Sequence, residues 1–343
     1  MSRHRIVALA GAGAVVLSTL IAAGPAAAQD RLVVTAFGGV WRESIEKNFI
    51  ACFKQRTGKD VAIQTGESAD WLNRIRANPG NPPIHVVTLA QSDTTRGIRD
   101  GLFDKVTVDK APNLKDIPER FYKDWGSHSV DVHVGGLGVI YNKDVIKDPP
   151  KDWKALIDAI AAGKYGKKVS FPSGTYSWGP DMLWHIAQLY DGNIDMAFAK
   201  MKAIAPYVVK FWTNPVEALN LFGSKEVDLM VYWDGRAWAF IDGGNPWAGF
   251  YLPEPNSLGA TVGFSKVKNA PDFAWVYIDC ALSPGPQLGH MKTLRYTVTN
   301  PKVAIPDDIK GKISPADKLV WPNYVEFIDK FPAWVERWNK EMR

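Results

Sequence analysis

Trp233, Asp234 and Arg236 could together contact a small ligand, because a ring, a carboxylate and a guanidinium group lie close together in the chain. They follow the apolar and aromatic run 227–232, which is typical of a buried strand. The run 237–240 predicts a helix, so Asp234 can cap that helix or bind a ligand amine. Arg236 can bind a ligand carboxylate or remain a solvated helix residue. Because open α/β sheets bind small ligands at the carboxyl ends of their strands, this segment predicts a binding site.

Other candidate ligand contacts also follow predicted strands. Glycines at such a turn let a ligand approach the backbone, hydroxyl and amide side chains can donate or accept hydrogen bonds, and tryptophan rings can stack on a ligand. The residues of this kind are Gly38, Gly39, Trp41, Gln91, Ser92, Ser173, Thr175 and Trp178. A purely structural role is the alternative for each of them, above all core packing for the two tryptophans.

The elements that would position these residues alternate between strands and helices. Strands are predicted at 31–37, 59–65 and 84–89, and helical periodicity follows each of them. A second set of strands and helices occupies 153–255. This order predicts an α/β fold, and a chain of 343 residues is long enough for two domains.

Three segments are candidates for chain crossings between the two domains. The predicted strand 129–141 is interrupted by Gly135 and Gly136. The segment 257–264 is also strand-like and carries glycines, and 296–300 precedes a proline. Crossings of this kind would leave a cleft between the domains, with the strand ends facing it.

The N-terminal segment 1–28 has the composition of a secretory signal peptide. Arg3 and Arg5 precede an uncharged apolar run, and alanines at 26–28 form a cleavage site after Ala28. A membrane anchor is the alternative, although the apolar run is short for a membrane span. We therefore expect an exported protein with a periplasmic location.

Composition excludes several other classes of protein. A net charge of +5 gives no reason to expect a nucleic-acid partner. Cys52 and Cys280 are the only cysteines, and an exported protein permits a disulfide between them, but the residues alone leave the bridge open. His128 and His133 would face opposite sides of a strand, and the chain contains none of the common metal or nucleophile motifs. We predict no metal, no cofactor and no catalytic residue.

The chain resembles the bacterial extracellular solute-binding proteins of ABC importers, in the branch that includes the spermidine/putrescine-binding proteins. The segments that carry the resemblance are 49–61 (FIACFKQRTGKDV), 138–144 (GVIYNKD), 227–239 (VDLMVYWDGRAWA) and 273–287 (FAWVYIDCALSPGPQ). It implies a type II periplasmic-binding-protein fold, an α/β fold of two lobes joined by hinge strands, with the ligand cleft between them. The implied lobes are 29–136 with 260–299, and 137–259 with 300–343. It also implies that the helix containing Cys280 belongs to the first lobe, which favours the disulfide.

The departures from that branch concern the ligand. Trp233 and Asp234 match the family pattern, but the first strand ends in Phe37 where the polyamine binders have tryptophan. The segment 257–262 lacks the expected acidic residue, and the loop 173–177 carries hydroxyls in place of carboxylates. We therefore expect the loop 173–178 and the segment 259–261, which includes Thr261, to determine specificity. A zwitterionic, amine-bearing or polyhydroxylated solute suits this set better than a polycation, because an unpaired buried charge is costly.

The resemblance implies a monomeric periplasmic receptor that closes on its solute and presents it to an ABC permease in the inner membrane. The alternative from the residues is an exported two-domain α/β hydrolase or isomerase. Such an enzyme needs a nucleophile and a base at the strand ends, and the sequence contains no recognisable pair of this kind.

Overall fold

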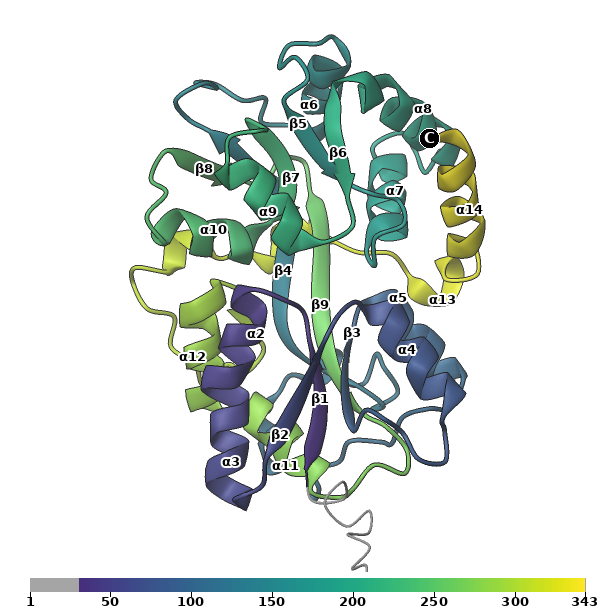
Figure 1. Ribbon diagram of the computed structural model, residues 1–343, viewed down its shortest axis with the longest axis vertical. Coiled ribbons are helices and arrows are strands. Elements are labelled where there is room, and N and C mark those ends of the chain that lie inside the picture. Colours follow the sequence, from purple (N-terminus) through teal and green to yellow (C-terminus); the bar gives the residue numbers. More distant parts are fainter. Residues whose placement is uncertain (1–30, 343) are drawn as a thin grey trace, which may run out of the picture.

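The computed structural model describes residues 31–342, so the predicted signal peptide 1–28 and its cleavage site lie outside the described residues. Figure 1 shows an elongated molecule with a lower and an upper half, and strands β4 and β9 run through both. None of the helices between residues 31 and 342 combines the length and the apolar composition that a membrane crossing requires.

The lower half contains a parallel set of strands in the order β2-β1-β3, and β3 is antiparallel to β9. Helices cover both faces of these strands (Figure 1). The elements of this half are β1 (Leu32–Ala36), β2 (Val61–Thr65), β3 (Val86–Leu89), α2 (Val40–Ser44), α3 (Ala51–Thr57), α4 (Ser68–Ala77), α5 (Gln91–Arg99), α11 (Ala274–Leu282) and α12 (Pro284–Leu294).

The upper half repeats this arrangement, because β5 pairs in parallel with both β6 and β7, and β7 is antiparallel to β4. In chain order β5 is followed by α7, β6 by α9 and β7 by α10 (Figure 1). The elements are β5 (Val169–Pro172), β6 (Val208–Trp212), β7 (Leu229–Trp233), β8 (Ala248–Tyr251), α6 (Trp153–Ala161), α7 (Gly179–Gln188), α8 (Ile194–Ile204), α9 (Pro215–Gly223), α10 (Asp234–Asp242) and α14 (Phe331–Glu341).

The two long strands that connect the halves are β4 (Val130–Asn142) and β9 (Ser257–Lys266), which pair antiparallel. Gly136 lies opposite Gly259 in this pair, so the lobe boundaries predicted from the sequence face each other on the two strands. Three further short elements pack near these two strands. These are β10 (Thr297–Val298), which pairs with β4, β11 (Leu319–Val320), which pairs with β9, and α13 (Tyr324–Phe327), which packs on α5.

The first helix differs from the regular α-helix that the apolar spacing predicts. Between α2 and α3 the chain forms a π-helical turn, Ile45–Ile50. The Asn48 side chain donates a hydrogen bond to the Ser44 carbonyl, and α12 packs so closely here that a Cβ on Gly289 would lie 1.9 Å from Oδ1 of Asn48. A side chain that inserts into the backbone hydrogen-bond ladder is a known cause of such distortions.

A disulfide joins the first helical segment to a helix that lies far away in the chain. Cys52 on α3 bonds to Cys280 on α11, with their Cα atoms 5.9 Å apart and a sequence separation of 228 residues. The bridge therefore ties together the N-terminal and C-terminal parts of the lower half.

Candidate ligand-binding site

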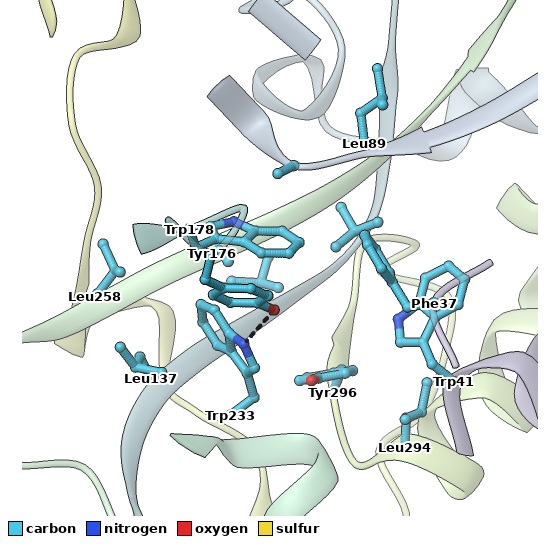
Figure 2. Close-up of a cluster of buried hydrophobic side chains, with 14 of the residues drawn as sticks. Phe37, Trp41, Leu89, Leu137, Tyr176, Trp178, Trp233, Leu258, Leu294 and Tyr296 are labelled. Atoms are coloured by element: carbon cyan, nitrogen blue, oxygen red, sulfur yellow. Dashed lines mark hydrogen bonds between the residues drawn. The ribbon is translucent and has the colours of Figure 1, made fainter. Parts of the chain in front are cut away.

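An aromatic cavity lies between the halves, on one face of the β4–β9 pair (Figure 2). Its volume is about 30 Å³, so the surrounding side chains fill most of the space between the halves. Six aromatic side chains line it. They are Phe37, Trp41, Tyr176, Trp178, Trp233 and Tyr296.

The rings come from segments that the fold brings together at the ends of strands. Trp233 is the last residue of β7, and Trp178 immediately precedes α7. These two rings meet edge to face with their centroids 5.5 Å apart, and Trp178 also lies 5.6 Å from Phe37 of the lower half. The Trp233 indole donates a hydrogen bond of 3.2 Å to the Tyr176 hydroxyl (Figure 2). Tilted and edge-to-face rings of this kind form a surface on which a flat ligand can pack.

Arg236 places a positive charge against this aromatic surface. Its side chain is buried and extends from α10 to the lower half, where Nη1 donates a hydrogen bond of 3.1 Å to the carbonyl of Gly38. Within residues 31–342 it forms no ion pair with a carboxylate. Gly39 has a φ of 65°, which favours glycine, and a Cβ there would lie 3.1 Å from a methyl of Val216 and 3.6 Å from Nη1, an ordinary contact distance. A buried guanidinium with no carboxylate at ion-pair distance is suited to bind an acceptor or anionic group of a ligand.

Glu67 is the acidic group beside the cavity. Burial raises the pKa of its carboxyl to about 7, although the hydrogen bond from Ser177 and the charge of Arg236 both lower it. The Ser177 hydroxyl donates to Oε2 of Glu67 at 3.3 Å, and this bond joins the upper half to the lower half. Glu67 can therefore change its charge near neutral pH when a ligand or solvent reaches it.

Asp234 lies behind the aromatic cavity and does not line it. The carboxyl is fully buried, accepts a 2.7 Å bond from the backbone N–H of Gly235, and is hydrogen-bonded to Ser314 and to the backbone of Gly136. Burial raises its pKa to about 7 against these hydrogen bonds. In this arrangement the carboxyl connects α10 to the hinge strand β4 and to the chain beyond β10.

A chain of buried polar side chains runs from the cavity wall into the lower half. His133 lines the cavity, and its Nδ1 lies 2.9 Å from Nε2 of His290, whose Nδ1 lies 2.8 Å from the Ser44 hydroxyl. Burial lowers the pKa of both imidazoles, that of His290 to about 3. Both rings are therefore neutral at physiological pH and fix the position of Trp41, which packs against them.

The remaining residues predicted from the sequence lie at three other places. Ser173 and Thr175 bond to each other at 2.8 Å in the turn after β5, and Thr175 is exposed. Ser92 is buried in the first turn of α5. Gln91 and Thr261 line a second, larger cavity on the opposite face of the β4–β9 pair. The structure thus gathers Gly38, Gly39, Trp41, Trp178, Trp233 and Arg236 around the aromatic cavity and separates the other six from it.

The structure adds side chains that the sequence did not single out as ligand contacts. Phe37, His133 and Tyr296 line the cavity, and Glu67 lies beside it. Tyr176 also lines it, and it belongs to the loop 173–178, which we expect to determine specificity. Phe37 ends a predicted strand, and His133 and Tyr296 stand in predicted crossings, so their positions were a usable signal. Glu67 carried no such signal, because a single acidic residue before a helix is more typical of a helix start.

Comparison with known proteins identifies the family. The model of the bacterial extracellular solute-binding proteins matches residues 48–316, more than half of the chain. The chain belongs to this family. Structural similarity agrees, since an extracellular solute-binding protein from Bordetella parapertussis superposes with a TM-score of 0.75 at 24% identity, covering 92% of this chain and 100% of that one. The fold is therefore the two-lobed type II periplasmic-binding-protein fold, as predicted.

Two relatives of this solute-binding protein are named for the solutes that they recognise. It is 25% identical to the thiamine-binding periplasmic protein of Salmonella typhimurium over 334 residues, which is 94% of this chain and 96% of the relative. It is 19% identical to the norspermidine sensor of Vibrio cholerae over 175 residues, about half of each protein. These relatives confirm the resemblance to solute-binding proteins of ABC importers, including a polyamine-related branch, and none supports the hydrolase or isomerase alternative.

The buried carboxyls of this solute-binding protein should make its stability depend on pH. The folded-state pKa of Asp234 is raised to about 7, so the unfolded chain loses this proton first as the pH rises. The free energy of unfolding should therefore fall between about pH 4 and pH 7, by up to ~1.4 kcal/mol per pH unit for this group. Urea unfolding of the wild type and of Asp234→Asn across this range measures the effect.

The Asp234→Asn variant isolates that contribution from other titrating groups. The wild type should lose stability relative to the variant as the pH rises from 4 to 7, and the difference should then stay constant. A difference that does not change with pH would show that Asp234 ionises as it does in the unfolded chain.

Proposed function

We propose that this protein is the periplasmic receptor of an ABC importer for a flat, ring-containing solute with a group that accepts hydrogen bonds from Arg236. In this proposal the signal peptide is removed after Ala28, and the protein acts as a monomer. The lobes are 29–136 with 260–299, and 137–259 with 300–343. The closed, loaded form delivers the unchanged solute to a permease in the inner membrane.

One observation carries the proposal. Aromatic rings from both halves, and the guanidinium of Arg236 from the upper half, lie around the same cavity. Phe37 and Trp41 come from the lower half, Trp178 and Trp233 from the upper half, and Arg236 bonds across the gap to Gly38. Aromatic faces bind flat rings and cations, and a planar guanidinium binds oxygen acceptors in a fixed geometry. A small solute that touches all of these groups would contact both lobes at once.

In this arrangement the solute should favour closure, because it would bind the closed state more tightly than the open state. A cavity of about 30 Å³ holds roughly one water molecule, so a solute can enter only when the halves separate. The contacts that such an opening breaks include Phe37 with Trp178 and Ser177 with Glu67. A solute between the rings would replace these contacts and add its own, and it would therefore favour the closed state.

The thiamine-binding relatives narrow the class of solute. Thiamine consists of two linked flat rings, one of them positively charged, and such a molecule matches the tryptophan rings of the cavity beside an ionisable Glu67. A linear polyamine would bring several charges toward Arg236 with only Glu67 to balance them. The same reasoning favours a ring-containing solute over a polyhydroxylated one, because Ser173 and Thr175 bond to each other.

Isothermal titration calorimetry with thiamine, thiamine monophosphate and putrescine tests this proposal. Thiamine monophosphate should bind about tenfold more tightly than thiamine, because its phosphate can pair with Arg236. Putrescine should bind most weakly of the three. Arg236→Gln should remove the preference for the phosphate and leave thiamine binding nearly unchanged.

The opposite order would contradict the proposal. Putrescine as the tightest ligand would mean that the carboxylates near the cleft dominate recognition. Recovery of each solute after binding, checked by chromatography, separates a receptor from an enzyme. Any chemical conversion of the solute would instead support the hydrolase or isomerase alternative.

A further inference from the structure

A second cavity lies on the face of the β4–β9 pair that is turned away from the aromatic cavity. The register explains the separation, because Val134 pairs with Thr261 and Gly135 pairs with Ala260, and neighbouring side chains of a strand point to opposite faces. Gly135 and Ala260 line the aromatic cavity, whereas Thr261 lines the second one. The second cavity has a volume of about 690 Å³, within the range of small-molecule sites.

A β-bulge turns an acidic side chain into this cavity. The register of β4 shifts between Asp131 and His133, so these two residues line different cavities although they are two positions apart. Gly263 gives Asp131 its space, since a Cβ on that glycine would lie 3.0 Å from Oδ1 of the carboxyl. The bulge and the glycine together place a carboxyl where a regular strand would not.

The floor of the second cavity is polar and incompletely paired. Asp131 is 3% exposed, and its Oδ2 accepts a hydrogen bond of 3.0 Å from the Trp125 indole. Thr261 is 5% exposed, and its hydroxyl lies close enough to Asp131 to lower the pKa of that carboxyl, yet it forms no hydrogen bond of ordinary geometry within the described part of the chain. Burial is the larger effect and raises the pKa of Asp131 to about 7. A buried carboxyl and a buried hydroxyl without a firm partner are suited to a ligand that donates hydrogen bonds.

The walls of this cavity are aromatic and its edge is apolar. Phe121, Trp125 and Tyr324 form part of the lining together with Trp321 and Val325 from the chain around α13. Trp321 is 39% exposed and Val325 is 79% exposed, so apolar side chains stand in solvent at the edge of the cavity. Exposed apolar groups next to a cavity commonly mark a binding site.

The two arginines of the lining are already engaged by the protein. Arg99 forms an ion pair of 2.6 Å with Asp329, and the guanidinium of Arg120 lies 4.5 Å above the ring of Phe121. The acidic groups Asp124 and Asp131 have no arginine or lysine partner of this kind in the region that the structure describes. A ligand in this cavity therefore meets two carboxyls without an ion-pair partner, aromatic walls and the charge of Arg120.

We propose that this cavity is a second small-molecule site, which takes a primary amine with an apolar or aromatic body. The ammonium group would bind Asp131 in a charge-assisted hydrogen bond and donate to Thr261. The body of the amine would pack against Trp125 and Trp321, whose faces also attract the cation. Binding of the amine at this site would not depend on the solute that binds in the aromatic cavity.

Titration calorimetry of the whole protein with 2-phenylethylamine tests the proposal, with 2-phenylethanol as the uncharged analogue of the same shape. The amine should bind with a Kd below about 1 mM and about tenfold or more tightly than the alcohol. Asp131→Asn and Trp321→Ala should each weaken binding of the amine by about tenfold or more. Trp233→Ala, in the other cavity, should change this affinity less than about twofold.

Two outcomes would overturn the second site. The first is that the folded wild type binds no amine at an amine concentration several times the expected Kd. Amine binding that Trp233→Ala abolishes and that Asp131→Asn and Trp321→Ala leave intact is the other, because it places the amine in the aromatic cavity. Trp321 is partly exposed, so the Trp321→Ala variant should fold and decide the matter even if Asp131→Asn does not.

Discussion

Replacing Trp233 with alanine should weaken solute binding by about a hundredfold, the largest loss of affinity that we expect from one substitution. The ring contacts Trp178 and bonds to Tyr176, so its removal takes away one wall of the aromatic cavity and leaves the Tyr176 hydroxyl without its indole partner. Central, desolvated aromatic residues carry a large share of binding energy in protein sites. Titration with thiamine or thiamine monophosphate, whichever binds the wild type, measures the change.

Trp153→Ala is the matched control for that experiment. Trp153 is as buried as Trp233, but it lies on α6, and its indole bonds to the Ser257 hydroxyl away from the aromatic cavity. This variant should lose about 3–5 kcal/mol of unfolding free energy and keep its affinity. Trp233→Ala should show the reverse, because its ring faces a gap that opens when the lobes separate. Unchanged affinity with a large loss of stability in Trp233→Ala would show that Trp233 is a core residue.

Removal of the disulfide should cost as much stability as the Trp153→Ala substitution. The Cys52–Cys280 bond closes a loop across 228 residues, and a cross-link of that length restricts the unfolded chain strongly. We expect the double variant Cys52→Ala/Cys280→Ala to lose about 3–5 kcal/mol of unfolding free energy, measured by urea denaturation. Alanine avoids placing a hydroxyl in the site of Cys280, which is fully buried.

The disulfide variant should nevertheless keep its affinity for solute. The bridge joins α3 to α11, and neither cysteine lines the aromatic cavity. The ion pair of 2.6 Å between Arg56 and Asp279 also remains beside it. An unfolding free energy within about 1 kcal/mol of the wild type would show that other contacts, including this pair, already hold the two helices together.

The local pattern of the chain predicts the elements near the site well. The apolar run before Trp233 is strand β7, and the segment from Asp234 onward is helix α10. The strand and helix predictions succeed because strand and helix periodicity, turn residues and caps act over a few neighbouring residues. The predicted interruption at Gly135 and Gly136 is wrong, because both glycines pair with β9 and β4 continues through them.

The chemistry of the site depends on contacts that sequence patterns do not encode. In the sequence Asp234 could cap its helix or bind a ligand amine, and in the structure it is buried against Ser314 and the backbone of Gly136. The acidic group beside the cavity is Glu67, whose pKa is raised because the upper half covers it. Packing between segments that are distant in sequence therefore decides which carboxylate can contact a ligand.

What the sequence by itself determined is the family, the order of strands and helices, and the placing of Trp233 and Arg236 at a strand end that faces the other half. What only the tertiary structure decided is which residues share a cavity. The bulge between Asp131 and His133 sends their side chains to opposite faces, and the register places Thr261 with Asp131. A shift of one residue in a strand reverses the face of every side chain that follows, and the pairing of two strands more than 100 residues apart sets that shift.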